Sequence, residues 1–220
     1  MSNFLISIGN FPEQALPTVC SALSCGAAKH FPSLEMFHLS SRAVDKSLSS
    51  FVRSLSGFHD FLSENESDIP LFPTRFSFSS CTAVLPQYRE FSSGGDPSLL
   101  LSALRGRNMP LSYKTDREAV EWAFSYLLTE KPNSSCEELY HFVDRIQEAL
   151  SEGSKVRLAL LCDISDCFSA AAALVLMPWL RSCLSGKGLH IALVALAAPS
   201  APASPSFVPD IRSVFGAAVV

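Results

Sequence analysis

The sequence contains few charged residues and no cluster of lysines or arginines. Charged side chains make up 17% of the 220 residues and hydrophobic ones 48%, whereas an average globular chain is roughly 25% charged. Such a chain can bury a large core. Either the domain is large and compact or another molecule covers part of its surface, and we favour the second alternative. The net charge of −4 and the missing basic patch argue against a nucleic-acid partner held by phosphate contacts.

The sequence also lacks a recognisable targeting signal and a long apolar run. Residues 1–8 contain no basic side chain and only a five-residue apolar stretch, so we expect no signal peptide. The apolar stretches 170–180 and 189–198 are shorter than the ~20 residues that span a bilayer. These absences predict a cytoplasmic protein with no membrane partner.

Cysteines are present, but not in a pattern typical of metal sites. The sequence has seven, which without a signal peptide are expected to be free thiols in a reducing compartment. Two pairs, Cys20/Cys25 and Cys162/Cys167, have the spacing C-x4-C, and neither has a histidine or a second tight pair nearby. We therefore predict buried thiols, no metal site and no cofactor.

Apolar runs that predict strands alternate with helical patterns. Residues 156–162 are almost continuously apolar, as expected of a strand buried on both faces of a parallel sheet. A turn at 163–166, a helix over 167–184 interrupted by Pro178, and an apolar strand at 189–196 complete a β-turn-α-β unit. Further strands are predicted at 4–8, 34–39 and 75–78, and further helices from 16, over 45–62 and over 117–128. Ser134 and Ser135, with Glu137 and Glu138, are predicted to begin another helix, which runs to 149 or 150.

The order and spacing of these elements resemble the bacterial tubulin-like proteins. The first strand ends at the Gly9-Asn10 turn, and the last third holds the strand 155–162, a loop, an alanine-rich helix and the strand 189–196. The resemblance covers most of 4–199, which is the N-terminal, nucleotide-binding half of that family. It implies an α/β fold in which a mostly parallel sheet is flanked by helices, in a tubulin-like or Rossmann-like three-layer arrangement.

We expect one α/β domain over residues 1–198. It includes an irregular but ordered excursion at about 65–96, rich in proline and aromatic residues. Residues 199–220 are expected to form a proline-rich tail or linker with an apolar end.

The sequence departs from the family at both phosphate-binding positions. In the family, the loop after the strand 155–162 is a glycine-rich cradle whose backbone N–H groups approach the phosphates. Here Asp163–Ser169 contains no glycine and two carboxylates. Like charges ~4 Å apart cost about 4 kcal/mol at an effective dielectric near 20. At the first turn Gly9 matches, but Asn10 begins a stretch without the expected further glycine.

These departures predict a vestigial nucleotide site with no catalytic residue. Its surface is expected to contain Gly9, Asn10, Asp163, Ser165, Asp166 and Ser169.

Other interpretations of the same loop stay open. Asp163-x-Ser165-x-Cys167 resembles the metal-binding loop of von Willebrand type A domains, although a thiol is a poor ligand for Mg²⁺. Alternatively Asp163 or Ser165 caps the following helix and Asp166 complements its dipole. Cys167 at the helix N-terminus is a candidate redox-sensitive thiol. The five histidines are scattered and are predicted to be structural, with His38 and His190 in core or strand-end positions.

The leading functional hypothesis is a non-catalytic, tubulin-like interaction or scaffold subunit. Such a subunit would have lost GTP hydrolysis and would bind another protein, either an active tubulin-like relative or a larger complex. A second hypothesis is a nucleotide- or Mg²⁺-dependent switch or GTPase-like enzyme that uses residues 163–169. A third is a structural subunit of a larger assembly.

Overall fold

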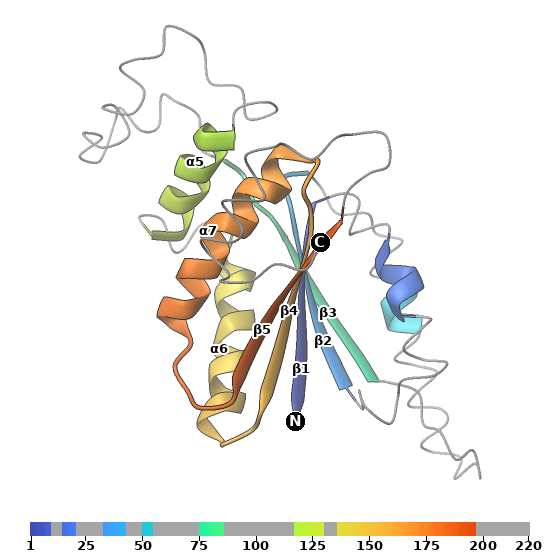
Figure 1. Cartoon of the computed structure of the whole chain (residues 1–220). Helices are drawn as coiled ribbons and strands as arrows, with labels where there is room; N and C mark the ends of the chain where they lie inside the picture. Colours follow the sequence, from blue (N-terminus) through green and yellow to red (C-terminus); the bar gives the residue numbers. More distant parts are fainter. Residues whose placement is uncertain are drawn as a thin grey trace, which may run out of the picture.

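The chain forms a parallel sheet whose central strand comes first in the sequence (Figure 1). Hydrogen bonding places the five strands in the order β3-β2-β1-β4-β5, and every neighbouring pair is parallel. The strands are β1 (Ser2–Ile8), β2 (Ser33–Ser40), β3 (Arg75–Thr82), β4 (Val156–Asp163) and β5 (Leu189–Leu196). The computed structural model describes residues 1–9, 15–20, 33–42, 50–54, 75–85, 117–129 and 136–196. The predicted α/β class with a parallel sheet is confirmed.

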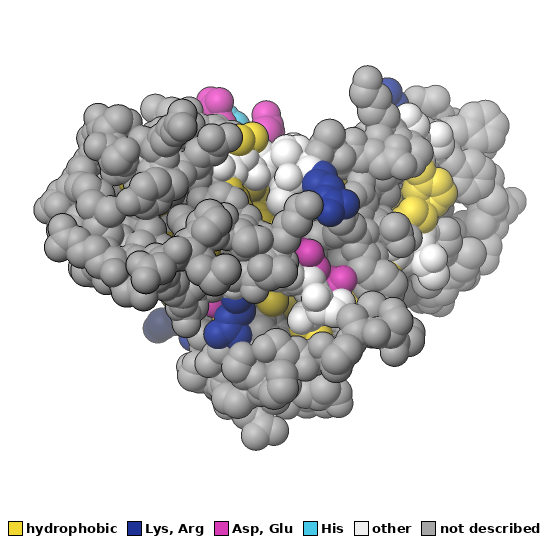
Figure 2. All heavy atoms as spheres, turned by 90° about the horizontal axis from the view of Figure 1, so that it is seen from above, with side chains coloured by type: hydrophobic (Ala, Val, Ile, Leu, Met, Phe, Trp, Pro, Cys, Tyr) yellow, Lys and Arg dark blue, Asp and Glu magenta, His cyan; other side chains and the backbone are white. Residues whose placement is uncertain are grey.

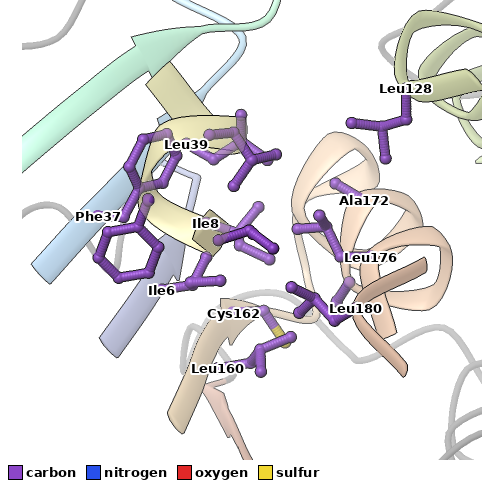
Figure 3. Packing of buried hydrophobic residues seen from close by; sticks show 14 of the residues in the cluster. Ile6, Ile8, Phe37, Leu39, Leu128, Leu160, Cys162, Ala172, Leu176 and Leu180 are labelled. Atoms are coloured by element: carbon purple, nitrogen blue, oxygen red, sulfur yellow. The ribbon is translucent and has the colours of Figure 1, made fainter. Parts of the chain in front are cut away.

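Among the described residues, three helices lie on one side of the sheet, which we call the α7 face. They are α5 (Arg117–Thr129), α6 (Glu137–Ser151) and α7 (Cys167–Cys183), and Figure 1 shows them on the same side of the strands. α6 and α7 pack on the strands, and α5 packs on α7. Figure 3 shows side chains of β1, β2 and β4 meeting those of α7 in this core.

Aromatic rings join α6 to the strands of the α7 face. The ring of Phe142 lies 5.7 Å from that of Phe4 and 5.3 Å from that of Phe37, measured between centroids. All three side chains are buried. Burial of an aromatic side chain removes a large apolar area from water, so this cluster makes a major contribution to fixing α6 on β1 and β2.

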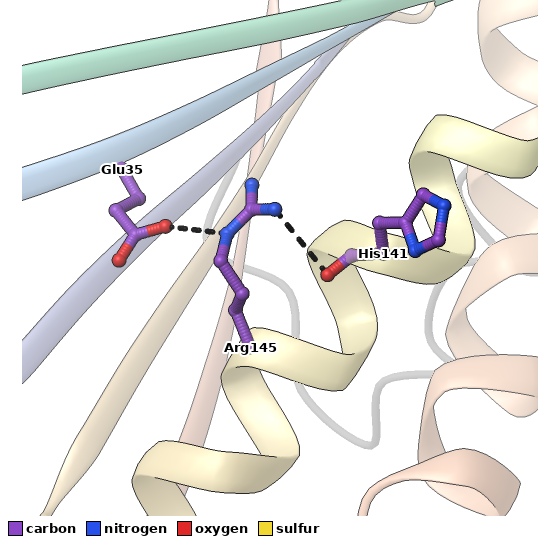
Figure 4. A network of polar contacts seen from close by, with 3 residues as sticks. All are labelled: Glu35, His141 and Arg145. Atoms are coloured by element: carbon purple, nitrogen blue, oxygen red, sulfur yellow. Dashed lines mark hydrogen bonds and ion pairs between the residues drawn. The ribbon is translucent and has the colours of Figure 1, made fainter.

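An ion pair at the surface orients α6 across β2 (Figure 4). Arg145 Nε lies 3.0 Å from Glu35 Oε2, and Arg145 Nη1 donates to the backbone oxygen of His141 at 3.4 Å. The guanidinium also lies over the Phe142 ring, 5.4 Å from its centroid. Because both charged side chains are partly exposed, the pair contributes at most about 1 kcal/mol to stability.

The other side of the sheet, which we call the opposite face, is covered over its β1–β3 half. The helical segments 15–20 and 50–54 lie on this side in Figure 1. They form a second core with strand residues of β1, β2 and β3 and with one residue of β4; its buried members are Leu5, Leu16, Cys20, Leu34, Met36, Val52, Phe76 and Leu161. The two cores and the sheet between them give the three layers that the sequence predicts.

Several predicted boundaries are refined by the structure. β3 was predicted to end at Phe78 but continues to Thr82, because its backbone pairs with β2 over the whole length of that strand. α6 has Cys136 as its N-cap, with no side-chain capping bond. Ser134 and Ser135, predicted to begin this helix, lie outside the described residues, as do most of 45–62, 65–96 and all of 199–220. No helix among the described residues is long and apolar enough to cross a membrane.

Candidate functional site

The candidate site lies where the connections from two neighbouring strands leave the sheet on different faces. After β1 the helical segment 15–20 covers the opposite face, and after β4 helix α7 covers the α7 face. In open α/β sheets, ligands bind at this switch point, beyond the carboxyl ends of the strands. Figure 2 looks onto that edge and shows acidic side chains with a basic side chain beside them near its middle.

Gly9 brings the end of β1 against the first turn of α7. Its φ is +91°, a conformation that side chains other than glycine rarely adopt, and its N–H donates to Leu39 O at 2.9 Å. A Cβ atom at this position would lie 2.9 Å from Ser169 Cβ and 3.4 Å from Asp166 Oδ2. The space beside Gly9, which a phosphate would need, is therefore filled by side chains of α7.

Ser169 joins the two strand ends through its hydroxyl. The Oγ atom donates to the backbone oxygen of Ile8 and accepts from the backbone N–H of Asp163 at 2.8 Å. The side chain is fully buried. One hydroxyl thus bridges the last residues of β1 and β4, and it does so from the first turn of α7.

Two aspartates satisfy the backbone of the loop and of the helix N-terminus. Asp166 is the N-cap of α7, and its Oδ2 accepts from Ser169 N at 2.8 Å. Asp163 Oδ1 accepts from Ser165 N at 2.9 Å and from the Ser165 hydroxyl. The expectation that Asp163 or Ser165 caps the helix is therefore wrong: Asp163 closes a local turn, which leaves the capping position three residues before Ser169 to Asp166.

Most backbone donors of the loop are used within the chain. Asp163 N donates to Ser169 Oγ, Ile164 N to Leu196 O at 2.8 Å, Ser165 N to Asp163 Oδ1, and Asp166 N to Asp163 O at 3.3 Å. In a phosphate-binding loop the corresponding N–H groups point at the ligand. Here they are engaged internally.

The electrostatic environment of the loop is acidic and partly desolvated. Burial raises the pKa of the Asp166 carboxyl above its ordinary value of 3.8, and the nearby charge of Asp163 raises it further. The Ser169 N–H and the charge of Arg42 act in the opposite direction and lower this pKa. A phosphate here would meet two carboxylates, one of them 6% exposed, which is unfavourable for an anion.

The structure brings together five of the six residues predicted for the vestigial site. Gly9, Asp163, Ser165, Asp166 and Ser169 lie around the ends of β1 and β4. Asn10 lies outside the described residues.

The described histidines and cysteines differ in burial. Cys183 is exposed and Cys167 half-buried, so the prediction of buried thiols is wrong for Cys183, which ends α7 at the surface. His38 is buried and its Nδ1 lies 2.8 Å from Ser7 Oγ, as expected of a core residue, whereas His190 is exposed near the start of β5. Burial raises the pKa of the Cys162 thiol to about 12. In the part of the chain that the structure describes, no three His, Cys, Asp or Glu residues are grouped so that they could hold a metal ion.

Sequence reasoning missed a groove on the opposite face of the sheet. This β4–β5 groove has a volume of about 730 Å³ and is bordered by the amino-terminal parts of β1, β4 and β5, with Lys155, Arg157 and His190 among its lining residues. The alternation of exposed and half-buried residues along β5 cannot be read from its sequence, which is apolar except for His190. It arises from which helices cover that strand, and local sequence carries no signal for this.

Comparison of the chain with protein-family models, with curated proteins and with solved structures gives no match. The resemblance to tubulin-like proteins therefore stays a prediction.

Proposed function

We propose that this protein is a non-catalytic interaction subunit, built on a tubulin-like nucleotide domain, that binds another protein and has lost GTP hydrolysis. In this proposal the partner is an active tubulin-like relative or a larger complex. The proposal places the protein in the cytoplasm, which agrees with the free thiols of the described cysteines.

The observation that carries the proposal is the closed switch point. Hydrolysis of a nucleoside triphosphate depends on positioning and electrostatic stabilisation of the phosphates, because the protein does little covalent chemistry itself. Backbone donors at this edge are engaged by Asp163, Asp166 and Ser169. A nucleotide would have to break these bonds, displace Ser169 from Gly9 and accept two carboxylates beside its phosphates.

The residues that fill the switch point also stabilise the fold. Ser169 ties α7 to the ends of β1 and β4, and Asp166 caps a helix whose buried face contributes to the main core. In a site kept open for a ligand, some of these hydrogen-bonding groups would have no partner in the free protein. Here the polar groups of Ser169 and Asp166 form hydrogen bonds within the chain, which supports a structural role for this edge.

A Mg²⁺-dependent switch is less well supported by the same geometry. The two oxygens Asp163 Oδ1 and Asp166 Oδ2 accept hydrogen bonds from the backbone of their own loop. A cation that used them would compete with these bonds. The switch hypothesis predicts a divalent-dependent rise in melting temperature that disappears in Asp163→Ala.

Isothermal titration of the purified chain with GTP and with ATP, each in the presence of Mg²⁺, tests the proposal. We expect no binding heat at nucleotide concentrations up to the millimolar range. Micromolar binding of either nucleotide would contradict the non-catalytic interpretation. The companion measurement is a thermal melt with and without Mg²⁺, which we expect to coincide.

A further inference from the structure

The opposite face of the sheet differs between its two halves. Over β1–β3 it lies under the helical segments 15–20 and 50–54, and the strand residues there are buried. Over β4 and β5, Arg157, His190, Ala192 and Val194 are exposed, Val194 by 45%. The strand register puts these four on one continuous surface, with Arg157 opposite His190 and Ala192 next along β5.

The β4–β5 groove offers a helix a floor of small side chains. Its floor contains two small side chains, Ala159 and Ala192, which are partners in the β4–β5 register. Val19 of the segment 15–20 lines its side, so a helix in the groove would continue the layer that this segment begins. Parallel sheets are usually covered by helices on both faces.

The length of the surface fits a short helix. From His190 to Leu196 the strand advances about 20 Å, at roughly 3.3 Å per residue. A helix of about 13 residues has the same length, at roughly 1.5 Å per residue. The exposed Val194 extends the apolar floor beyond the groove in that direction.

The described charged side chains at the groove are basic. Lys155 and His190 supply basic groups at its amino end, and none of the described residues that line it is an aspartate or glutamate. This contrasts with the acidic carboxyl edge of the same strands and with the net charge of −4. Complementary charge favours a partner segment that carries carboxylates.

We propose that the β4–β5 groove binds an amphipathic helix of the partner protein, with an apolar stripe against Ala159, Ala192 and Val194 and carboxylates facing Lys155 and His190. This inference rests on the proposed function, because it identifies where and by what chemistry the partner binds. It is a helix-in-groove mode, in which apolar anchors supply affinity and the charged rim supplies orientation.

The test is site-specific photo-crosslinking in the host organism, with the partner segment identified by mass spectrometry of the crosslinked peptide. A benzophenone amino acid replaces Ala192 in one variant and Val194 in a second, so that one misfolded variant does not decide the result. Control variants carry it at Val84 and Trp122, which are 66% and 40% exposed on other surfaces. Each variant is first compared with the wild type by thermal melting.

We expect crosslinks from positions 192 and 194 to an acidic, amphipathic helical segment of another protein. Lys155→Glu should lower their yield about tenfold, the effect of losing one favourable charge contact in the complex. Arg181→Glu, at an exposed position of α7 on the other side of the sheet, should leave the yield unchanged.

The experiment distinguishes failure of this inference from failure of the proposed function. Crosslinks to another protein only from Val84 or Trp122 would overturn the proposal that the groove binds the partner and would leave the proposed function standing. No crosslink to another protein from any position would count against both. Crosslinks from 192 and 194 to a second copy of the chain, to residues 197–220 of the same chain or to a segment without carboxylates would also overturn the inference.

Discussion

The two ends of the parallel strands differ in what occupies them. At the carboxyl ends of β1 and β4, Ser169 and two aspartates fill the crevice and engage its backbone donors. At the amino ends of β1, β4 and β5 a groove of about 730 Å³ stays open and carries basic side chains. The fold usually places its ligand at the first position. Among the described residues, those at the first position stabilise the structure, and the groove at the second is where we propose that a partner binds.

Gly9→Ala, at the closed carboxyl end of β1, should cause the largest loss of stability. The new Cβ would lie 2.9 Å from Ser169 Cβ, in a backbone with φ of +91°. We expect a loss of about 3 kcal/mol in the free energy of unfolding, from backbone strain and the forced displacement of α7 together. Urea denaturation followed by circular dichroism measures it.

Gly153→Ala is the matched control for that measurement. Gly153 has a φ of +79°, and nothing lies within 4 Å of its added Cβ. The Gly153→Ala variant should therefore lose only about 1 kcal/mol of unfolding free energy, from backbone strain alone. Equal losses for the two variants would show that the end of β1 is not in close contact with α7.

Ser169→Ala should have the next largest effect. It removes the hydroxyl that bonds to Ile8 O and Asp163 N, in a fully buried position. We expect a loss of about 2 kcal/mol in the free energy of unfolding. Ser182→Ala, in the same helix but with an exposed hydroxyl bonded to Trp179 O, should change it by less than about 0.5 kcal/mol. A loss no larger for Ser169→Ala than for this control would contradict the bridging role.

The charge of Asp166 should give a smaller effect, visible in the pH dependence of stability. Burial raises the pKa of its carboxyl in the folded protein above the ordinary value of 3.8. The folded state then holds the proton more tightly than the unfolded state does, so this group's contribution is fully present below pH 3.8 and declines as the pH rises through the folded pKa.

Comparison of the wild type with Asp166→Asn isolates this contribution. Urea unfolding of both proteins at pH 3.5 and at pH 6.5, a pair of values chosen on either side of about pH 4, gives the difference in unfolding free energy at each. We expect the wild type to lose stability relative to the variant at the higher pH. The reverse trend would mean that Arg42 and the Ser169 N–H outweigh desolvation.

The smallest effect on stability should come from a substitution on the exposed surface of β5, beside the β4–β5 groove. Val194→Ser alters a side chain that is 45% exposed on β5, and we expect less than about 0.5 kcal/mol of change in the free energy of unfolding. The same variant should weaken crosslinking from position 192, because it removes part of the apolar floor. A loss of stability above 1 kcal/mol would indicate that this side chain is already covered in the folded chain, at variance with a free docking surface.

The strands could be predicted from the sequence because their apolar runs are local signals. β4 and β5 were predicted to within one residue, since continuous apolar residues between turn signals leave few alternatives. The second half of β3 could not be predicted, because Ser79 and Ser80 favour a strand only through pairing with β2. Propensity is a weak guide where partner strands decide the structure.

The position of the candidate site could also be predicted from the sequence. The hydrogen bonds that fill it could not. A glycine turn after β1 and an acidic loop before α7 identify the switch point from the sequence alone. The bond from Ser169 to Ile8 O joins residues 161 positions apart, and no local pattern reveals it. The capping residue was mistaken because Asp163 and Asp166 both have a serine at a suitable spacing, and only the backbone conformation of the turn chooses between them.

The most direct test of the central claim is an NMR titration of isotopically labelled protein with GTP and Mg²⁺, which reports on the carboxyl ends of the strands residue by residue. We predict that the amide signals of Asp163, Ser165 and Ser169 stay unchanged, because their N–H groups are engaged within the chain. Saturable shifts of these amides at micromolar GTP would contradict the account, since they would show that the carboxyl edge opens to hold a nucleotide.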